Sequence, residues 1–152
     1  MPKAPQNVEI RPVGPDERAA WEPLWQGYLT FYKATLPQVA TDTAWKRFHD
    51  ANEQMFLLGA YVDGKLTGIV QFLYHRSSWT PGDYCYLQDL FVDNSARGLG
   101  LGRALIEAVY AKAKADGCSR VHWLTQNENA QARILYDQVA DNSGFMQYRK
   151  IL

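Results

Sequence analysis

Three alternating glycines and two arginines stand between an apolar run and an amphipathic segment, a pattern typical of phosphate binding. The residues are Arg97-Gly98-Leu99-Gly100-Leu101-Gly102-Arg103, and they follow Leu90-Phe91-Val92 closely. Glycine lets the backbone approach a ligand, and a helix N-terminus adds unpaired N–H donors and about half a positive charge. The segment therefore predicts a pyrophosphate site at the start of a helix, with Arg97 as a direct charged contact.

Two other nucleotide motifs are excluded by their spacing. A P-loop requires GxxxxGK[ST], and that string does not occur in the chain. The dinucleotide fingerprint GxGxxG would begin at Gly98 and Gly100, but position 103 is Arg, and residues 123–126 lack the acidic residue expected downstream. The remaining alternative is a tight turn that binds nothing, although three glycines are costly at a helix start without a ligand.

The composition is that of an ordinary folded protein. The chain has 152 residues, 47% apolar and 21% charged, which predicts one domain over residues 1–152. Basic and acidic side chains number 16 each, so we expect no nucleic-acid partner. Cys85 and Cys118 form no CxxC pair or cluster with the histidines, so we expect no metal. The chain has no signal-like start and no apolar run of about 20 residues, which favours a cytoplasmic protein without a membrane partner.

The elements that must position the glycine-rich turn follow from hydrophobic patterning. We expect strands at residues 7–13, 55–62, 66–74, 84–92, 120–125 and 145–152, and helices beginning near residues 15, 41, 101 and 129. Residues 76–83 are expected to be a polar loop. Asp63-Gly64 between two apolar runs is a strong hairpin signal. The order predicts an α/β fold, with a mixed sheet and helices on both faces.

The chain resembles the GCN5-related N-acetyltransferases (GNAT). Residues 97–102 match that family's [QR]-x-x-G-x-[GA] signature, and residues from about 8 to 152 fit its layout. Other positions look closer to the Hpa-type histone and polyamine acetyltransferases of yeast, namely residues 86–93, Tyr110, Trp123, Asn129, Ala132, Arg133 and Tyr136. The resemblance implies the GNAT fold, with a mostly antiparallel central sheet, and acetyl-CoA as cosubstrate.

The resemblance also implies which residues bind acetyl-CoA. The backbone of one strand would bind the pantetheine arm and supply the oxyanion donor, the turn amides would hold the pyrophosphate, and the helix near residue 129 would form the opposite wall. These residues are Leu90, Phe91, Val92, Arg97, Gly98, Leu99, Gly100, Leu101, Gly102, Arg103, Asn129, Ala132, Arg133 and Tyr136.

Tyr136 is the family's candidate for protonating the departing thiolate. It lies seven residues after Asn129, nearly two helical turns, so both face one side. A core tyrosine is the alternative. We expect Asp89 to be the base that accepts the amine's proton, although the neighbouring Gln88 departs from the acidic pair of diamine acetyltransferases. Because adjacent strand residues face opposite sides, a structural Asp89 that faces away from the amine is the alternative. His75 and a water chain remain alternative acceptors of that proton.

The acceptor site is expected beside the first helix and the loop at residues 76–83. Tyr28, Tyr32 and Trp79 are the candidates, because aromatic rings hold a cationic amine well. The alternative for Tyr28 and Tyr32 is that they belong to the apolar stripe with which the first helix faces the core. We expect a primary amine as substrate, whether polyamine, amino acid or lysine of a basic peptide, and a homodimer paired through residues 145–152. The competing function is a module that binds acetyl-CoA or another nucleotide without turning it over.

Overall fold

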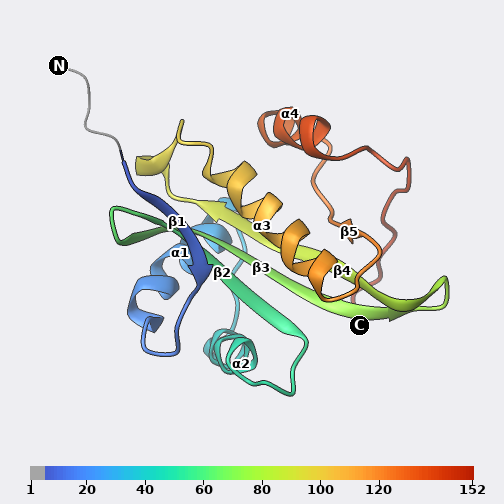
Figure 1. Cartoon of the computed structure of the whole chain (residues 1–152), viewed down its shortest axis with the longest axis horizontal. Helices are drawn as coiled ribbons and strands as arrows, with labels where there is room; N and C mark the ends of the chain where they lie inside the picture. Colours follow the sequence, from blue (N-terminus) through green and yellow to red (C-terminus); the bar gives the residue numbers. More distant parts are fainter. Residues whose placement is uncertain (1–5) are drawn as a thin grey trace. The chain divides into compact units, whose positions relative to one another are not determined.

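The computed structural model describes residues 6–152 and divides into two compact units (Figure 1). The first ends at His122 and the second covers Trp123–Leu152, and each is described by itself. The first unit contains β1 (Val8–Pro12), α1 (Arg18–Phe31), α2 (Gln38–Phe48), β2 (Met55–Val62), β3 (Lys65–Ser77), β4 (Thr80–Val92), a 3-10 turn (Asn94–Ala96), α3 (Leu101–Ala115) and β5 (Val121–His122). The second unit contains α4 (Ala130–Val139).

The five strands of residues 6–152 form one sheet in the order β1-β2-β3-β4-β5. Neighbouring strands are antiparallel except β4 and β5, which run parallel. Asp63 and Gly64 join β2 to β3 with φ angles of 49° and 82°, as a two-residue hairpin turn requires. The predicted α/β class and the mixed, mostly antiparallel sheet are therefore confirmed.

Helices cover both faces of this sheet. In β3, Gln71 accepts a hydrogen bond from Trp21 of α1, whereas Gly68 lies against Leu105 of α3. Residues 71 and 68 point to opposite faces because side chains alternate along a strand. In Figure 1, α3 lies over the sheet and runs roughly along β3 and β4. The aromatic stripe of α1 is buried at Trp21 and Trp25, so the expectation of a core-facing stripe holds for these positions.

A β-bulge interrupts β4 at Gln88. Gln71 pairs with Asp89 and Phe72 pairs with Leu87, which leaves Gln88 without a partner in β3. Gln88 is exposed, whereas Asp89 is buried toward α1. The extra residue therefore lets Asp89 reach the α1 face while Leu87 packs on the α3 face.

Three expectations for the elements are wrong. Residues 76–83 are not a loop, because β3 and β4 continue to a tight turn and pair as far as Ser77 and Thr80. The strand expected at residues 120–125 is only Val121–His122. Residues 145–152 form no strand, because within residues 6–152 no sheet edge pairs with them. An apolar alternation makes a strand only where a neighbour completes its hydrogen bonds.

Candidate active site

The glycine-rich turn joins β4 to α3 and has an open backbone. Gly98 and Gly100 have φ angles of 81° and 71°, which side-chain-bearing residues adopt at a cost. A β-carbon at either position would meet no other atom within 4 Å, so space in front of the turn is free. Buried Ala96 and Leu101 anchor the two ends of the turn.

The first turn of α3 is suited to a bound anion. Gly100 is its N-cap, no side chain caps the helix, and its first turn has no acidic residue. Arg97 is exposed beside the turn and Arg103 lies in the first helical turn. Uncapped helix amides together with nearby guanidinium groups fit a pyrophosphate, so these residues fit the group that the sequence predicts.

Close to this turn, the last residues of β4 are paired along one edge among residues 6–152. β5 pairs with β4 only at Cys85 and Tyr86 among residues 6–152, whereas β4 pairs with β3 up to Val92. Leu90, Phe91 and Val92 are half-buried. Their second edge therefore offers backbone donors and acceptors to an extended ligand.

Asp89 lies one residue before this segment and is held by two side chains. Gln71 Nε2 donates to Asp89 Oδ2 at 2.9 Å, and the Tyr28 hydroxyl also bonds the carboxylate. Only 9% of Asp89 is exposed. Burial raises the pKa of Asp89 above its ordinary value, and the bonds from Tyr28 and Gln71 act in the opposite direction. A carboxyl with a raised pKa is better matched to accept a proton near neutral pH.

Three tyrosines surround this carboxyl group. Tyr28 and Tyr32 of α1 have ring centroids 4.9 Å apart, and Tyr86 stands on β4. Burial, and then the charge of Asp89, raise the pKa of each phenol, so all three are protonated at neutral pH. The structure thus brings the predicted acceptor residues Tyr28 and Tyr32 to the predicted base.

Trp79 does not join this group. It lies in the tight turn between β3 and β4, with 78% of its side chain exposed. The strand pair extends six residues from Gln71 to Ser77, so Trp79 is about 20 Å from Asp89. Its expected role in the acceptor site has no geometric support in this unit.

Four predicted residues belong to the second unit. Asn129 directly precedes α4, and Ala132, Arg133 and Tyr136 lie within it. Arg133 Nη1 donates to the Asn127 carbonyl at 3.1 Å, and the ring of Tyr136 contacts Trp123 edge-on with centroids 5.4 Å apart. The helix places Asn129 and Tyr136 nearly two turns apart, as the sequence predicts.

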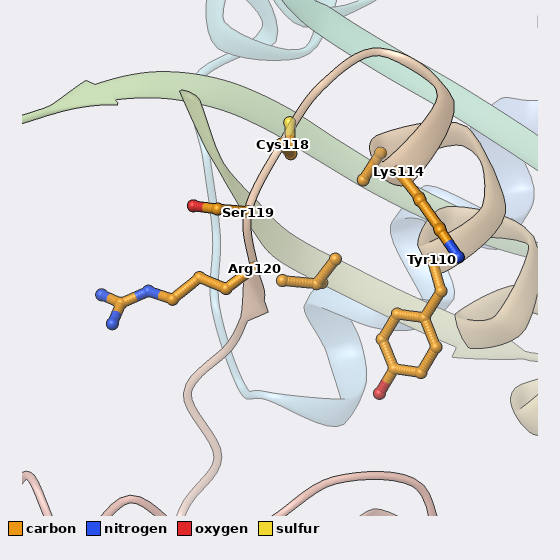
Figure 2. A pocket seen from close by; sticks show the side chains of 7 residues that line it. Tyr110, Lys114, Cys118, Ser119 and Arg120 are labelled. Carbon is orange, nitrogen blue, oxygen red and sulfur yellow. The ribbon is translucent and has the colours of Figure 1, made fainter. Parts of the chain in front are cut away.

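A shallow hollow of about 370 Å³ lies away from these residues, between the C-terminal half of α3 and β5 (Figure 2). Tyr110 and Lys114 line it on α3, whereas the Arg120 side chain points away from them. Lys114 is about 20 Å along the helix from the glycine-rich turn. The hollow is therefore not part of the candidate active site.

Sequence patterning missed several residues that build the site. Gln71 and Trp21 extend the hydrogen-bonded chain from Asp89, and Tyr86 adds a third phenol. The sequence does contain a signal for Gln71, since an amide inside the apolar run of β3 is expected to be buried and a buried polar side chain needs hydrogen-bond partners. His75 and His122 also meet on this sheet face, with their Nε2 atoms 3.0 Å apart.

The chain belongs to the acetyltransferase (GNAT) family, whose sequence profile matches residues 19–140. It is 32% identical over 146 residues to the D-amino-acid N-acetyltransferase HPA3 of Saccharomyces cerevisiae, covering 95% of this chain and 91% of the yeast protein. It is 28% identical to a thialysine N-epsilon-acetyltransferase of Caenorhabditis elegans, over 88% of this chain and 82% of that protein.

Solved structures of acetyltransferases share the fold. An aminoglycoside N-acetyltransferase in complex with CoA superposes with a TM-score of 0.80 at 19% identity, covering 99% of both chains. The predicted family, its Hpa-type branch, the fold and the acetyltransferase class are thus confirmed. Within residues 6–152, no helix combines the length and apolar character needed to cross a bilayer.

Proposed function

We propose that the protein transfers the acetyl group of acetyl-CoA to a primary amine by direct attack, with both substrates bound together. The observation that carries this proposal is the position of Asp89. A buried carboxyl among three tyrosines directly precedes Leu90–Val92, the strand segment that leads to the glycine-rich turn. An amine held at Asp89 would be adjacent to a thioester bound along that segment.

The turn and the strand bind acetyl-CoA in this proposal. The amides from Gly98 to Arg103 hold the pyrophosphate, with Arg97 as a charged contact, and the open edge of Leu90–Val92 bonds the pantetheine arm. A backbone N–H near Phe91 or Val92 stabilises the oxyanion of the tetrahedral intermediate. The family resemblance also assigns Asn129, Ala132 and Arg133 to acetyl-CoA.

Two side chains move protons. The amine attacks only when neutral, so Asp89 accepts its proton, directly or through a water molecule. The carbon–sulfur bond then breaks, and Tyr136 donates its phenolic proton to the departing thiolate. A phenol with an ordinary pKa of about 10 is protonated at neutral pH and suits this role.

The acceptor is a small molecule with a cationic amino group. Tyrosine rings and one buried carboxyl favour an ammonium ion that is largely desolvated when bound. The names of the yeast and nematode relatives describe amino-acid acceptors, which supports an amino acid over a basic peptide.

We also propose a homodimer in which the partner covers residues 145–152. The exposed apolar side chains there are Phe145, Met146, Tyr148, Ile151 and Leu152. Burial of such a segment favours association. Sedimentation equilibrium of the full chain and of a chain ending at residue 144 tests this, since only the full chain should dimerise.

The deciding experiment incubates the protein with acetyl-CoA and a panel of amines, including D- and L-amino acids, polyamines and a basic peptide, while free thiol release is followed. Acetyl transfer requires thiol release that depends on an added amine. A CoA-binding module without catalysis would bind the cosubstrate in calorimetry and release no thiol with any amine.

A further inference from the structure

We propose that Gln71 and Trp21 are positioning residues that determine which oxygen of Asp89 receives a proton. The three side chains come from β3, α1 and β4, and form one hydrogen-bonded chain. Trp21 Nε1 donates to Gln71 Oε1 at 2.8 Å, and Gln71 Nε2 donates to Asp89 Oδ2 at 2.9 Å. The exposed fractions of Trp21, Gln71 and Asp89 are 0%, 2% and 9%, so water does not compete for these bonds.

The indole determines the orientation of the amide. An indole N–H can only donate, so the atom of Gln71 that faces it must be the carbonyl oxygen. The amide NH₂ then necessarily faces Asp89 and donates to Oδ2. Rotating the amide by 180° would leave two N–H donors opposed at Trp21 and two oxygens opposed at Asp89, each costing about 1–3 kcal/mol.

This orientation makes the two oxygens of Asp89 unequal. Oδ2 accepts a hydrogen bond from Gln71, and a carbonyl-type oxygen accepts better than a protonated one. A proton that arrives at the carboxyl group therefore binds to Oδ1. Gln71 also stabilises the charged form, because its N–H bond is stronger to a carboxylate than to a neutral acid.

The causes that shift the pKa of Asp89 are burial and the bonds from Tyr28 and Gln71, and none of them is a cation. The titratable groups that face it are the phenols of Tyr28 and Tyr32 from α1 and of Tyr86 from β4. Burial raises the pKa of Asp89, and the bonds from Tyr28 and Gln71 lower it. Losing the Gln71 bond must therefore move protonation of Asp89 to higher pH.

This inference rests on the proposed function in one respect, that Asp89 accepts the proton of the amine. Protonation of the carboxyl group can nevertheless be measured without turnover. The test follows the side-chain carbon-13 resonance of Asp89 against pH, with the signal assigned by its absence in Asp89→Asn.

Three variants make the test specific. Trp21→Phe removes the N–H that orients the amide, and Gln71→Met removes the donor to Asp89 while keeping chain length. Trp25→Phe is the matched control, because Trp25 is a buried tryptophan of the same helix whose Nε1 bonds Thr41 instead, and phenylalanine keeps an aromatic ring against Tyr28. Gln71→Met leaves α1 unaltered if loss of the Trp21 indole prevents folding.

We expect the Asp89 titration midpoint to rise in Trp21→Phe and Gln71→Met and to stay unchanged in Trp25→Phe. At acidic pH, kcat/KM should be lower in Trp21→Phe and Gln71→Met than in Trp25→Phe. At high pH, kcat/KM of both variants should recover to the Trp25→Phe value. The fall should be about tenfold for a midpoint that rises by about one on the pH scale. Equal midpoints in all three variants would overturn the inference. If no amine is acetylated by the unaltered protein, the proposed function fails, while the carbon-13 titration still decides the positioning role.

Discussion

Gly27 of α1 lies directly against the ring of Phe91 in β4. A β-carbon at position 27 would be 2.8 Å from Cζ of that ring, closer than non-bonded atoms pack. Glycine inside a helix costs about 1 kcal/mol relative to alanine, so the site gives up helix stability for close packing. The helix and the proposed thioester-binding strand are thus in tight contact at a residue expected to bind acetyl-CoA.

Gly27→Ala should raise the KM for acetyl-CoA while lowering the free energy of unfolding only modestly. Overpacking costs about 1–3 kcal/mol, and the helix gains about 1 kcal/mol, so the net loss is at most about 2 kcal/mol. Phe91 must move to admit the methyl group, and its backbone is part of the proposed pantetheine site. Urea unfolding and steady-state kinetics measure the two effects. Gln26→Ala, at an exposed position of the same helix, is the control. An unchanged KM in Gly27→Ala would mean that the Phe91 ring does not position the strand.

Gly100→Asp and Gly100→Asn together isolate the charge at the glycine-rich turn. Both residues tolerate positive φ, and a β-carbon at position 100 meets no other atom within 4 Å. Both are good N-caps, and a negative charge there favours the helix dipole, so Asp should fold at least as well as Asn. A bound pyrophosphate would be repelled by Asp alone.

We therefore expect CoA affinity at least about tenfold weaker in Gly100→Asp than in Gly100→Asn, a difference of about 1.4 kcal/mol. Calorimetric titration at low and high salt measures it, and the difference should shrink as salt screens the charge. Equal affinities would place the pyrophosphate elsewhere.

Local signals in the sequence predicted much of this molecule. Asp63-Gly64 predicted the hairpin because both residues need positive φ, and the alternating glycines predicted the open turn at α3. The sequence indicates Tyr28 and Tyr32 as acceptor residues and Asp89 as the base on separate grounds, and the fold brings the three side chains together. Each of these predictions depends on a few neighbouring residues.

The errors concern pairing between distant segments. The bulge at Gln88 depends on the register between β3 and β4, which the alternation of β4 alone does not specify. The bond between Gln71 and Asp89 follows from that register. Residues 145–152 show strand-like alternation, but their structure depends on a partner edge that the local sequence does not encode. The sequence suggests Trp79 as an acceptor residue, but the turn between Ser77 and Thr80 places it at the far end of the hairpin.

Tyr136→Phe should lower kcat while leaving CoA affinity nearly unchanged. The variant removes only the phenolic oxygen, and general acid catalysis contributes about 10²–10⁴-fold to a reaction rate. Thiol release under saturating substrates measures kcat, and calorimetry measures affinity. Asp137→Asn, at an exposed position of the same helix, is the control. If turnover is maintained in Tyr136→Phe, another group protonates the thiolate.

His75 and His122 should make the fold sensitive to acid. His75 Nδ1 faces the Arg76 carbonyl, which only accepts, so this nitrogen carries hydrogen. In the neutral pair, His122 Nε2–H therefore donates to His75 Nε2 across 3.0 Å. Burial, and then the charges of His75 and Arg120, lower the pKa of His122. A proton added at His122 would therefore place a positive charge in a half-buried position near Arg120.

Because the native pKa of His122 is depressed, the unfolded chain binds a proton at this residue more readily than the folded one. The free energy of unfolding should therefore be highest above the ordinary histidine pKa of about 6.5 and decrease as pH falls through the native value. His122→Gln keeps an N–H donor for His75 and does not titrate. Urea unfolding at pH 7 and pH 5 should show a larger acid loss in the unaltered protein than in His122→Gln. An equal loss in both would mean that the pair does not contribute to acid sensitivity, since all other titrating groups are shared.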